Sequence, residues 1–548
     1  MRVALAQQNP TVGALEANTT RLLELAEQAT RGGADLIVSS ELALTGYPPL
    51  DLLGRSAFLS AAEAALARLT AELPAGIIAV VGTVLRRAPG TGGKPFANAA
   101  VVLERGQRLA VVEKALLPVY DVFDEARYFE PATPASIAPL NIRGKKVGIT
   151  ICEDLWNDAQ LFPERPYAFD PVERLAEQGA ELVLNLSASP WSLKKQAFRR
   201  RLVRHAAQRH RVLVAMANQI GGNDGLLFDG ASIAYAAGGA LIAEGRSFAE
   251  DLVFFDTERS PEIAEPKREP IADLVEALSL GIRDFFGKCG AKKAVLGLSG
   301  GIDSAVVASL AVRALGAENV TGLAMPSRYS SEGSVLDAQA LAHNLGVRLV
   351  TIPIEPMFEA FVETLAPAFA GKAPDVTEEN LQSRLRGVTV MAYSNKHGGM
   401  VLTTGNKSEC AMGYATLYGD TAGALAPIAD LYKHQVYAIA RYLNQARPTV
   451  PLASIDKPPS AELRPGQKDE DSLPPYAVLD PILEGLLEDG LTVEATADQT
   501  GQPVALVREI ARKVAQTEFK RRQYAPTLRV SERAWTGRVF PIAQRFSE

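Results

Sequence analysis

The sequence predicts an α/β fold in two parts, and three observations support this prediction. Short apolar segments typical of strands alternate with longer amphipathic segments typical of helices in both halves of the chain. A charged, proline-rich segment without periodicity, residues 258–270, separates the halves and is interpreted as a linker. A glycine-rich turn, residues 297–304, stands between a predicted strand and a predicted helix. We therefore expect one domain at 1–257 and another at 271–548.

The composition is typical of an ordinary soluble globular protein. The chain has 548 residues, of which 47% are hydrophobic and 22% charged, and this length suggests more than one domain. Its net charge of -6 argues against a nucleic-acid partner. No signal segment or membrane-spanning apolar run is evident, so a cytoplasmic location without membrane binding is expected. Three cysteines without a CxxC pair and five histidines without ligand spacing indicate neither a disulfide framework nor a zinc site.

The first half alternates predicted strands and helices. The expected strands are 3–6, 35–38, 77–81, 99–103, 147–151, 182–185 and 212–215, and the expected helices are 21–31, 57–73 and 198–209. Such a layered domain carries its functional groups at strand ends. Three residues stand at such ends, namely Glu41, Lys114 and Cys152.

These three residue types suit nucleophilic catalysis at a carbonyl carbon. A nucleophilic cysteine needs a base to form its thiolate and a cation to stabilise the oxyanion that follows attack. Each residue alone also has a structural explanation. Cys152 could be a small buried apolar residue, Glu41 a helix cap and Lys114 a surface charge.

The surrounding sequence resembles the nitrilase, or carbon–nitrogen hydrolase, family across nearly the whole first half. The resemblance rests on ELALTGYPP from Glu41, EKALLPVYDVFDEARYF around Lys114 and GITICEDLW around Cys152. It implies a four-layer α-β-β-α sandwich with amidase activity. On this resemblance Glu41 is the general base, Lys114 stabilises the oxyanion, and Cys152 is the nucleophile that forms a thioester.

The same resemblance implies further residues of a glutaminase site. Glu125 matches an auxiliary glutamate of the family. Tyr120, together with Ser189 and Lys195 in SASPWSLKK, resembles the residues that receive glutamine, while the neighbouring Ser187 and Lys194 remain alternatives. Ser40 stands where many relatives have proline, a difference expected to alter local rigidity only.

The second half predicts a parallel sheet with helices on both faces. A helix at 271–287 precedes the glycine-rich turn, and strands are expected at 320–325, 348–352 and 400–404. Ligands of such sheets bind beyond the carboxyl ends of the strands. Both the turn at 297–304 and the segment 403–409 follow predicted strands, and the hydroxyl groups and carboxylate of this second segment could complete a magnesium–nucleotide site.

The glycine-rich turn is suited to bind a pyrophosphate group. Gly300 and Gly301 lack Cβ atoms and let the backbone approach a ligand, and the helix start offers unpaired N–H groups to an anion. Asp303 adds a carboxylate that could hold magnesium. An ordinary turn with a helix cap is the alternative. The Gly-Lys-Ser/Thr of a Walker loop is absent, and the segment resembles the loop of ATP pyrophosphatases, which adenylate a substrate and release pyrophosphate.

Longer segments of the second half resemble the NAD synthetase family. They are EENLQSRLRG at 378–387, LTTGNKSE at 402–409, GYATLYGDTAG at 413–423 and KPPSAELRPGQKDEDSLPPY at 457–476. The resemblance implies an adenine nucleotide α-hydrolase-like doubly wound sheet. Segment 523–527 departs from the Gln-Ala-Pro-Pro-Gly pattern usual there. Segments 327–334 and 457–475 are expected to be mobile loops that order over ATP.

The resemblance implies three groups of binding residues in the second half. ATP is expected at Gly297, Leu298, Ser299, Gly300, Gly301, Ile302, Asp303, Ser304, Thr404 and Lys433; deamido-NAD at Asn380, Arg384, Glu409, Asp420 and Lys520; and Mg²⁺ at Asp303 and Glu409.

Together the two resemblances imply a glutamine-dependent amidation of deamido-NAD to NAD, with ATP as co-substrate. The first half would release ammonia from L-glutamine and the second would consume it. Another glutamine-dependent adenylating amidotransferase and a non-catalytic nucleotide-binding scaffold are the alternatives. The resemblance also implies a homo-oligomer based on dimers, with octamers among the family.

Overall fold

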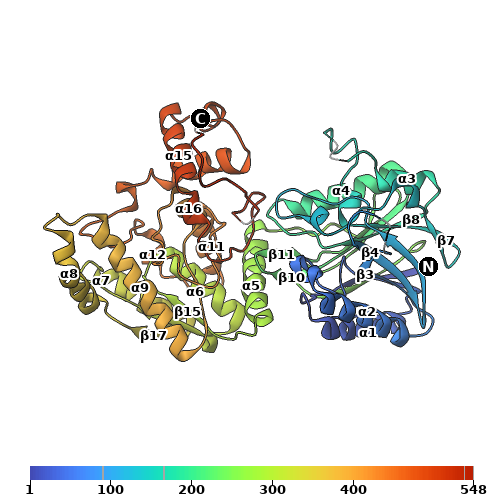
Figure 1. The fold of residues 1–548 in the computed structure, drawn as a ribbon, viewed down its shortest axis with the longest axis horizontal. Helices are drawn as coiled ribbons and strands as arrows, with labels where there is room; N and C mark the ends of the chain where they lie inside the picture. Colours follow the sequence, from blue (N-terminus) through green and yellow to red (C-terminus); the bar gives the residue numbers. More distant parts are fainter. Residues whose placement is uncertain (89, 91, 165–166, 536, 547–548) are drawn as a thin grey trace. The chain divides into compact units, whose positions relative to one another are not determined.

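The computed structural model describes residues 1–88, 90, 92–164, 167–535 and 537–546. The chain forms two compact units, Met1–Arg268 and Glu269–Glu548. In Figure 1 the first unit runs from blue to green and the second from green to red. Within the described part of the chain, no helix combines the length and apolar character needed to cross a membrane.

The first unit contains two six-stranded mixed sheets. One has the order β14-β1-β2-β3-β4-β5 and the other β13-β12-β9-β8-β7-β6. The strands of the first are β1 (Arg2–Gln7), β2 (Leu36–Val38), β3 (Ile78–Arg86), β4 (Phe96–Glu104), β5 (Gln107–Glu113) and β14 (Asp251–Asp256). Those of the second are β6 (Leu140–Ile142), β7 (Lys145–Ile151), β8 (Leu182–Ser187), β9 (Leu213–Asn218), β12 (Ile233–Tyr235) and β13 (Leu241–Glu244). A hairpin adds β10 (Ile220–Asn223) and β11 (Leu226–Asp229).

Alternation of side chains along the strands builds four layers. Val3 and Leu5 of β1 pack in one core with Ile149 of β7, so this core lies between the two sheets. Ala4 of β1 points to the other face, into a core shared with α1 (Leu15–Arg31) and α2 (Ser56–Glu72). Val183 of β8 packs with α3 (Pro171–Glu177) and α4 (Lys195–His210). The predicted four-layer sandwich is confirmed.

The second unit is organised on a four-stranded parallel sheet of order β17-β16-β15-β18. Its strands are β15 (Ala294–Gly297), β16 (Val320–Ala324), β17 (Arg348–Thr351) and β18 (Met400–Val401). The chain leaves β15 for β16 on one side and later returns to place β18 on the other. The carboxyl end of β15 is therefore a topological switch point, where open α/β sheets bind ligands. The glycine-rich turn lies there, and the predicted doubly wound fold is confirmed.

Helices surround this sheet (Figure 1). They are α5 (Pro270–Lys288), α6 (Ile302–Leu315), α7 (Glu332–Leu345), α8 (Glu355–Phe369) and α9 (Val376–His397), followed by α10 (Lys407–Met412), α11 (Lys433–Leu443) and α12 (Leu452–Asp456). A C-terminal group contains α13 (Tyr476–Leu483), α14 (Val493–Thr500), α15 (Val504–Gln516) and α16 (Glu518–Arg521). Of these helices, α13, α14 and α15 share an apolar core with α10. The strand expected at 400–404 ends at Val401, because Thr403 N donates to the Leu425 carbonyl outside the sheet. Thr403 and Thr404 thus lie in a loop.

Candidate active sites

Cys152 follows β7 directly and begins a short 3₁₀ turn, Cys152–Leu155. Its φ of 45° is in the left-handed region, which a non-glycine residue adopts only when its surroundings hold it there. Asp154 provides this support, since its carboxylate accepts hydrogen bonds from the N–H groups of Ile151, Ala115 and Leu116 at 2.9, 3.0 and 2.8 Å. One buried carboxylate therefore fixes the loops that carry both Cys152 and Lys114.

Lys114 lies between two glutamates in the interior of the first unit. Its Nζ is 2.6 Å from Oε1 of Glu41 and 2.8 Å from each carboxylate oxygen of Glu125. Asn98 Nδ2 donates to Glu41 Oε1 at 2.7 Å, and the Ala188 N–H donates to Glu41 Oε2 at 3.2 Å. The structure thus brings the four predicted catalytic residues into one buried region, with both Glu41 oxygens oriented by donors.

The charges of this cluster set its protonation states. Burial, together with the negative charge of Glu41, raises the pKa of the Cys152 thiol well above its ordinary value. Burial also acts to lower the pKa of Lys114, but Glu125 and Glu41 outweigh it and raise that pKa. Burial raises the pKa of Glu125 to about 7, against the opposing effect of Lys114. The resting cysteine is therefore a thiol that needs a base, beside a lysine that remains charged.

Two of the predicted glutamine-binding residues, Tyr120 and Lys195, act on Glu153, which sequence analysis did not identify. The Tyr120 hydroxyl donates to Glu153 at 3.0 Å, and the Tyr167 hydroxyl does so at 3.1 Å. Lys195 Nζ lies 4.1 Å from the centre of the Trp156 ring. Burial raises the pKa of Glu153, and the charge of Lys195 acts against this effect. The signal available in the sequence was the position of Glu153 next to Cys152.

Of the competing serine and lysine positions, Ser187 has its hydroxyl bonded within the protein. The Ser187 hydroxyl donates to Asn185 Oδ1 at 2.6 Å, and Lys194 is the residue that precedes α4. Ser189 is buried, with its N–H bonded to Asn218 Oδ1 at 3.0 Å. The hydroxyl of Ser187 is thus already bonded within the protein.

In the second unit, a cavity of about 330 Å³ lies at the carboxyl ends of β15 and β16. The predicted ATP residues line it, apart from Gly300: Gly297, Leu298, Ser299, Gly301, Ile302, Asp303, Ser304, Thr404 and Lys433. Gly300 has a φ of 77°, and a Cβ at this position would lie 2.2 Å from the Ser334 carbonyl oxygen. Only glycine therefore fits the turn between β15 and α6.

Two carboxylates and a lysine meet in this cavity. Lys433 Nζ is 2.6 Å from Asp303 Oδ2 and 3.3 Å from Glu409 Oε1, and Asn406 Nδ2 donates to Asp303 Oδ1 at 3.0 Å. Burial raises the pKa of Glu409 to about 8, and the negative charges of Asp303 and Asp469 add to this effect. Converging carboxylate oxygens are the ligands that Mg²⁺ prefers, so these residues fit the predicted metal.

The remaining predicted deamido-NAD residues gather around the loop at 413–420. Asn380 Oδ1 accepts from the Thr416 hydroxyl at 2.8 Å, and Asp420 Oδ1 accepts from the Thr416 N–H at 2.7 Å. Arg384 Nε donates to the Leu417 carbonyl at 3.2 Å. Lys520 Nζ donates to two carbonyls of the same loop at 2.7 and 2.8 Å. Residues from α9, α16 and the loop thus form one polar cluster, and Asp420 also lines the nucleotide cavity.

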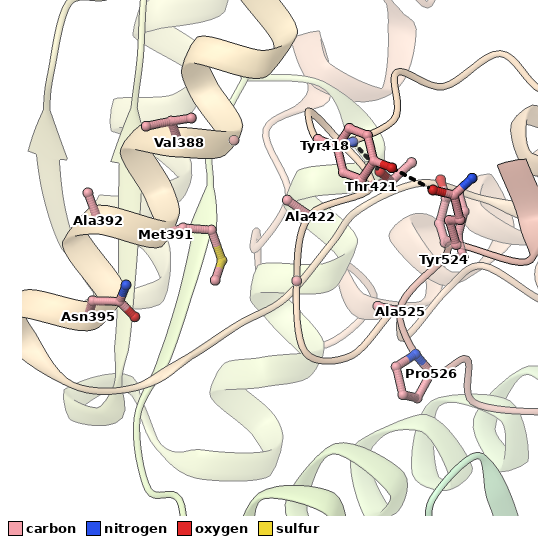
Figure 2. A pocket seen from close by; sticks show the side chains of 13 residues that line it. Val388, Met391, Ala392, Asn395, Tyr418, Thr421, Ala422, Tyr524, Ala525 and Pro526 are labelled. Atoms are coloured by element: carbon pink, nitrogen blue, oxygen red, sulfur yellow. Dashed lines mark hydrogen bonds between the residues drawn. The ribbon is translucent and has the colours of Figure 1, made fainter.

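A second cavity, of about 670 Å³, is lined mainly by apolar atoms. Figure 2 shows Val388, Met391, Ala392 and Asn395 along α9 on one side of it, with Tyr418 and segment 524–526 opposite. The side chains of Val388 and Tyr418 are largely exposed, at 64% and 67%. This is an open apolar surface beside the polar cluster.

The two loops expected to order over ATP contact each other. The Glu462 carboxylate accepts hydrogen bonds from the Ser331 and Ser334 hydroxyls at 2.8 and 2.7 Å. Lys457 Nζ donates to Ser334 at 3.1 Å and to Asp337 at 2.8 Å. Residues of both loops line the nucleotide cavity. In this structure the segment 457–475 is therefore held to the start of α7.

The two folds and their buried sites define a class of protein, an amidase of the nitrilase type joined to an ATP-using synthetase. Residues 2–260 match the carbon-nitrogen hydrolase family and residues 274–524 match NAD synthase. A glutamine-dependent NAD(+) synthetase of Synechocystis sp. is 46% identical, with 99% of each chain covered, and that of Thermotoga maritima is 40% identical, with 100% of this chain and 99% of the relative covered. The solved structure of the glutamine-dependent NAD+ synthetase from Acinetobacter baumannii, in complex with ADP, is 36% identical in sequence and superposes with a TM-score of 0.77. The match covers 99% of this chain and 98% of that chain. The chain belongs to the glutamine-dependent NAD(+) synthetase family, which is ligase-class, and the predicted family is confirmed.

Proposed function

We propose that the chain converts deamido-NAD, ATP, L-glutamine and water to NAD, AMP, pyrophosphate and L-glutamate. The observation that carries this proposal is the presence, in one chain, of a buried Cys152–Glu41–Lys114 cluster and of a nucleotide cavity formed by the turn after β15. Residues 1–257 act as the glutamine amidohydrolase and residues 271–548 as the synthetase, with 258–270 as linker. Ammonia formed by the first domain passes to the second.

In the amidohydrolase site, Glu41 takes the proton of the Cys152 thiol as the sulfur attacks the amide carbon of glutamine. Lys114 remains charged and stabilises the oxyanion. The proton then moves from Glu41 to the leaving nitrogen, ammonia departs, and water hydrolyses the thioester to glutamate. Glu125 holds Lys114 in place, while Tyr120, Ser189 and Lys195 bind the amino-acid end of glutamine.

In the synthetase site, the carboxylate of deamido-NAD attacks the α-phosphorus of ATP. The bond between the α-phosphorus and the bridging oxygen breaks, and pyrophosphate leaves along the turn at 297–304. Ammonia then attacks the acyl carbon and displaces AMP, and a proton is released. Thr404 and Lys433 contact ATP, and Asn380, Arg384, Glu409, Asp420 and Lys520 orient deamido-NAD.

Mg²⁺ belongs to this proposal because Asp303 and Glu409 present converging carboxylates in the nucleotide cavity. When bound, the ion supplies positive charge to the triphosphate. The buried glutamate, with its pKa of about 8, becomes a better ligand as that pKa falls beside a cation.

We also propose a cytoplasmic homo-oligomer built from dimers, with octamers among its possible assemblies. The exposed apolar surface around Val388, Met391 and Tyr418 supports association, because a surface of this kind is usually covered in the assembled protein (Figure 2). Within the assembly, ammonia moves through the interior, since a protonated amine cannot attack an acyl carbon.

A side-by-side assay tests the function. Purified protein is supplied with deamido-NAD, ATP and Mg²⁺, and with either glutamine or an ammonium salt, and NAD, AMP and pyrophosphate are measured. Equal amounts of the three products from both nitrogen sources are expected. Pyrophosphate release that does not depend on deamido-NAD would indicate another adenylating amidotransferase, and its complete absence would indicate a nucleotide-binding scaffold.

A further inference from the structure

Helix α9 presents two different faces. Residues four positions apart lie on the same side of a helix, so Gln382, Arg386 and Val390 share one face. Val390 is buried in the core of the sheet with Val295 and Val401, which shows that this face points inward. Val388, Met391 and Asn395 line the apolar cavity on another face (Figure 2). Arg386 is therefore directed toward the sheet, although it lies only two residues from Arg384.

The guanidinium of Arg386 is anchored at the carboxyl end of β16. Its Nε donates to the Met325 carbonyl oxygen at 3.1 Å, and its Nη2 lies 3.5 Å from the Ser327 hydroxyl. Arg386 also lines the nucleotide cavity together with Ser299 and Asp303. Since a guanidinium has five N–H donors, several remain for a ligand in that cavity.

The charge of Arg386 is not balanced by a carboxylate at ion-pair distance within the part of the chain that the structure describes. Burial lowers the pKa of Arg386, and Glu462 and Asp420 act on it only as neighbouring charges. A largely desolvated cation without a carboxylate partner is costly to keep, although Arg386 itself is only half-buried. An anionic ligand in the cavity would supply the missing partner.

The two neighbouring carboxylates indicate which anion that is. Glu462 contacts Ser334, whose carbonyl oxygen faces Gly300 of the phosphate-binding turn. Asp420 belongs to the polar cluster around loop 413–420. Arg386, Glu462 and Asp420 all line the nucleotide cavity. Arg386 thus lies in the same cavity as residues of the proposed ATP side and of the proposed dinucleotide side, and in the proposed reaction these two substrates join at the α-phosphate.

We propose that Arg386 is a catalytic residue of the synthetase site that contacts the α-phosphate of ATP. This inference rests on the proposed function. As the dinucleotide carboxylate attacks, a new C–O–P link forms and the bond to the bridging oxygen of pyrophosphate breaks, so negative charge grows on the α-phosphate oxygens. Arg386 donates to these oxygens and is itself unchanged by the step. It remains bound to the AMP moiety until ammonia displaces AMP.

The experiment compares three variants, Arg386→Gln, Arg386→Lys and the matched control Arg384→Gln. The measured quantity is the deamido-NAD-dependent exchange of labelled pyrophosphate into ATP, which reports adenylate formation without ammonia. For Arg386→Gln we expect a fall in the exchange rate of about 10²- to 10³-fold, with the KM for deamido-NAD within about threefold of wild type. Lysine should restore part of the rate because it keeps the charge but lacks the planar fork. Arg384→Gln should mainly raise the KM for deamido-NAD.

An exchange rate within about twofold of wild type in folded Arg386→Gln would overturn the inference, as would a defect confined to the KM for deamido-NAD. Thermal unfolding of each variant is measured in parallel. If Arg386→Gln does not fold, Arg386→Lys provides the test. An exchange rate equal to that of wild type in Arg386→Lys would then count against the α-phosphate contact. Wild-type protein without any exchange would instead contradict the proposed function itself.

Discussion

The ammonium nitrogen of Lys114 lies 2.6 Å from Oε1 of Glu41 in a region from which solvent is almost completely excluded. The same nitrogen also binds both oxygens of Glu125. One cation therefore holds two carboxylates close together, and the predicted base and the predicted oxyanion stabiliser form a single electrostatic unit.

Replacing Lys114 by methionine should remove glutaminase activity and also destabilise the protein. The variant leaves Glu41 and Glu125 buried side by side without their cation, and loss of one partner of a buried ion pair costs about 3–5 kcal/mol. Urea denaturation gives the stability. The double variant Lys114→Met/Glu125→Gln should recover part of the lost stability while remaining inactive with glutamine. Equal stability of Lys114→Met and wild type would contradict this description of the cluster.

The raised pKa of Glu125 predicts a pH-dependent stability. Its pKa increases from 4.5 in the unfolded chain to about 7 in the folded protein, so the folded state binds more protons between these values. The contribution of Glu125 to stability is therefore fully present below about pH 4.5 and is lost as the pH rises through 7. Relative to Glu125→Gln, wild type should lose up to about 3 kcal/mol between pH 4.5 and pH 8. The free energy of unfolding of both proteins is measured by urea denaturation at several pH values. A difference between wild type and Glu125→Gln that stays constant from pH 4.5 to pH 8 would contradict the assigned pKa.

Much of the fold could be predicted from local patterns in the sequence. The strand, turn and helix around Gly300 were recognisable because apolar alternation stops at glycines, where the helix begins. The short antiparallel strands β10 to β13 were not predicted, since three or four residues give too little periodicity. Among the site residues, Arg386 was overlooked because its spacing from Val390 marks the inward face only once the sheet is known. The ion pair of Lys433 with Asp303 joins residues far apart in the chain, which no local pattern specifies.

Asp303→Asn should stop NAD formation from both glutamine and ammonium. The carboxylate lies in the nucleotide cavity beside Lys433, and its loss removes a proposed metal ligand. NAD formation is followed at several Mg²⁺ concentrations. Treatment of wild type with a chelator should have the same effect, reversed by added Mg²⁺, while hydrolysis of glutamine needs no metal. Full activity of the variant at limiting Mg²⁺ would exclude Asp303 from the metal site.

Glu462→Ala should weaken the binding of ATP. The glutamate joins segment 457–475 to Ser331 and Ser334, and without it the segment loses one of its attachments to α7, while the contacts of Lys457 to Ser334 and Asp337 remain. We expect a rise in the KM for ATP of about 10-fold, with the KM for deamido-NAD little changed. Limited proteolysis should cut the variant faster within 457–475 than it cuts wild type. An unaltered KM and unaltered cleavage would show that this contact does not hold the loop.

The central claim is that nitrogen released by Cys152 becomes the amide of NAD, and isotope labelling tests it most directly. Protein is given deamido-NAD, ATP, Mg²⁺ and glutamine labelled with ¹⁵N in its amide, and the NAD formed is analysed by mass spectrometry. Wild type should yield NAD that carries one ¹⁵N. Cys152→Ala should yield none from glutamine, a fall of about 10³-fold or more, yet should form NAD from ammonium salt. Labelled NAD from Cys152→Ala, or no labelled NAD from wild type, would contradict the claim.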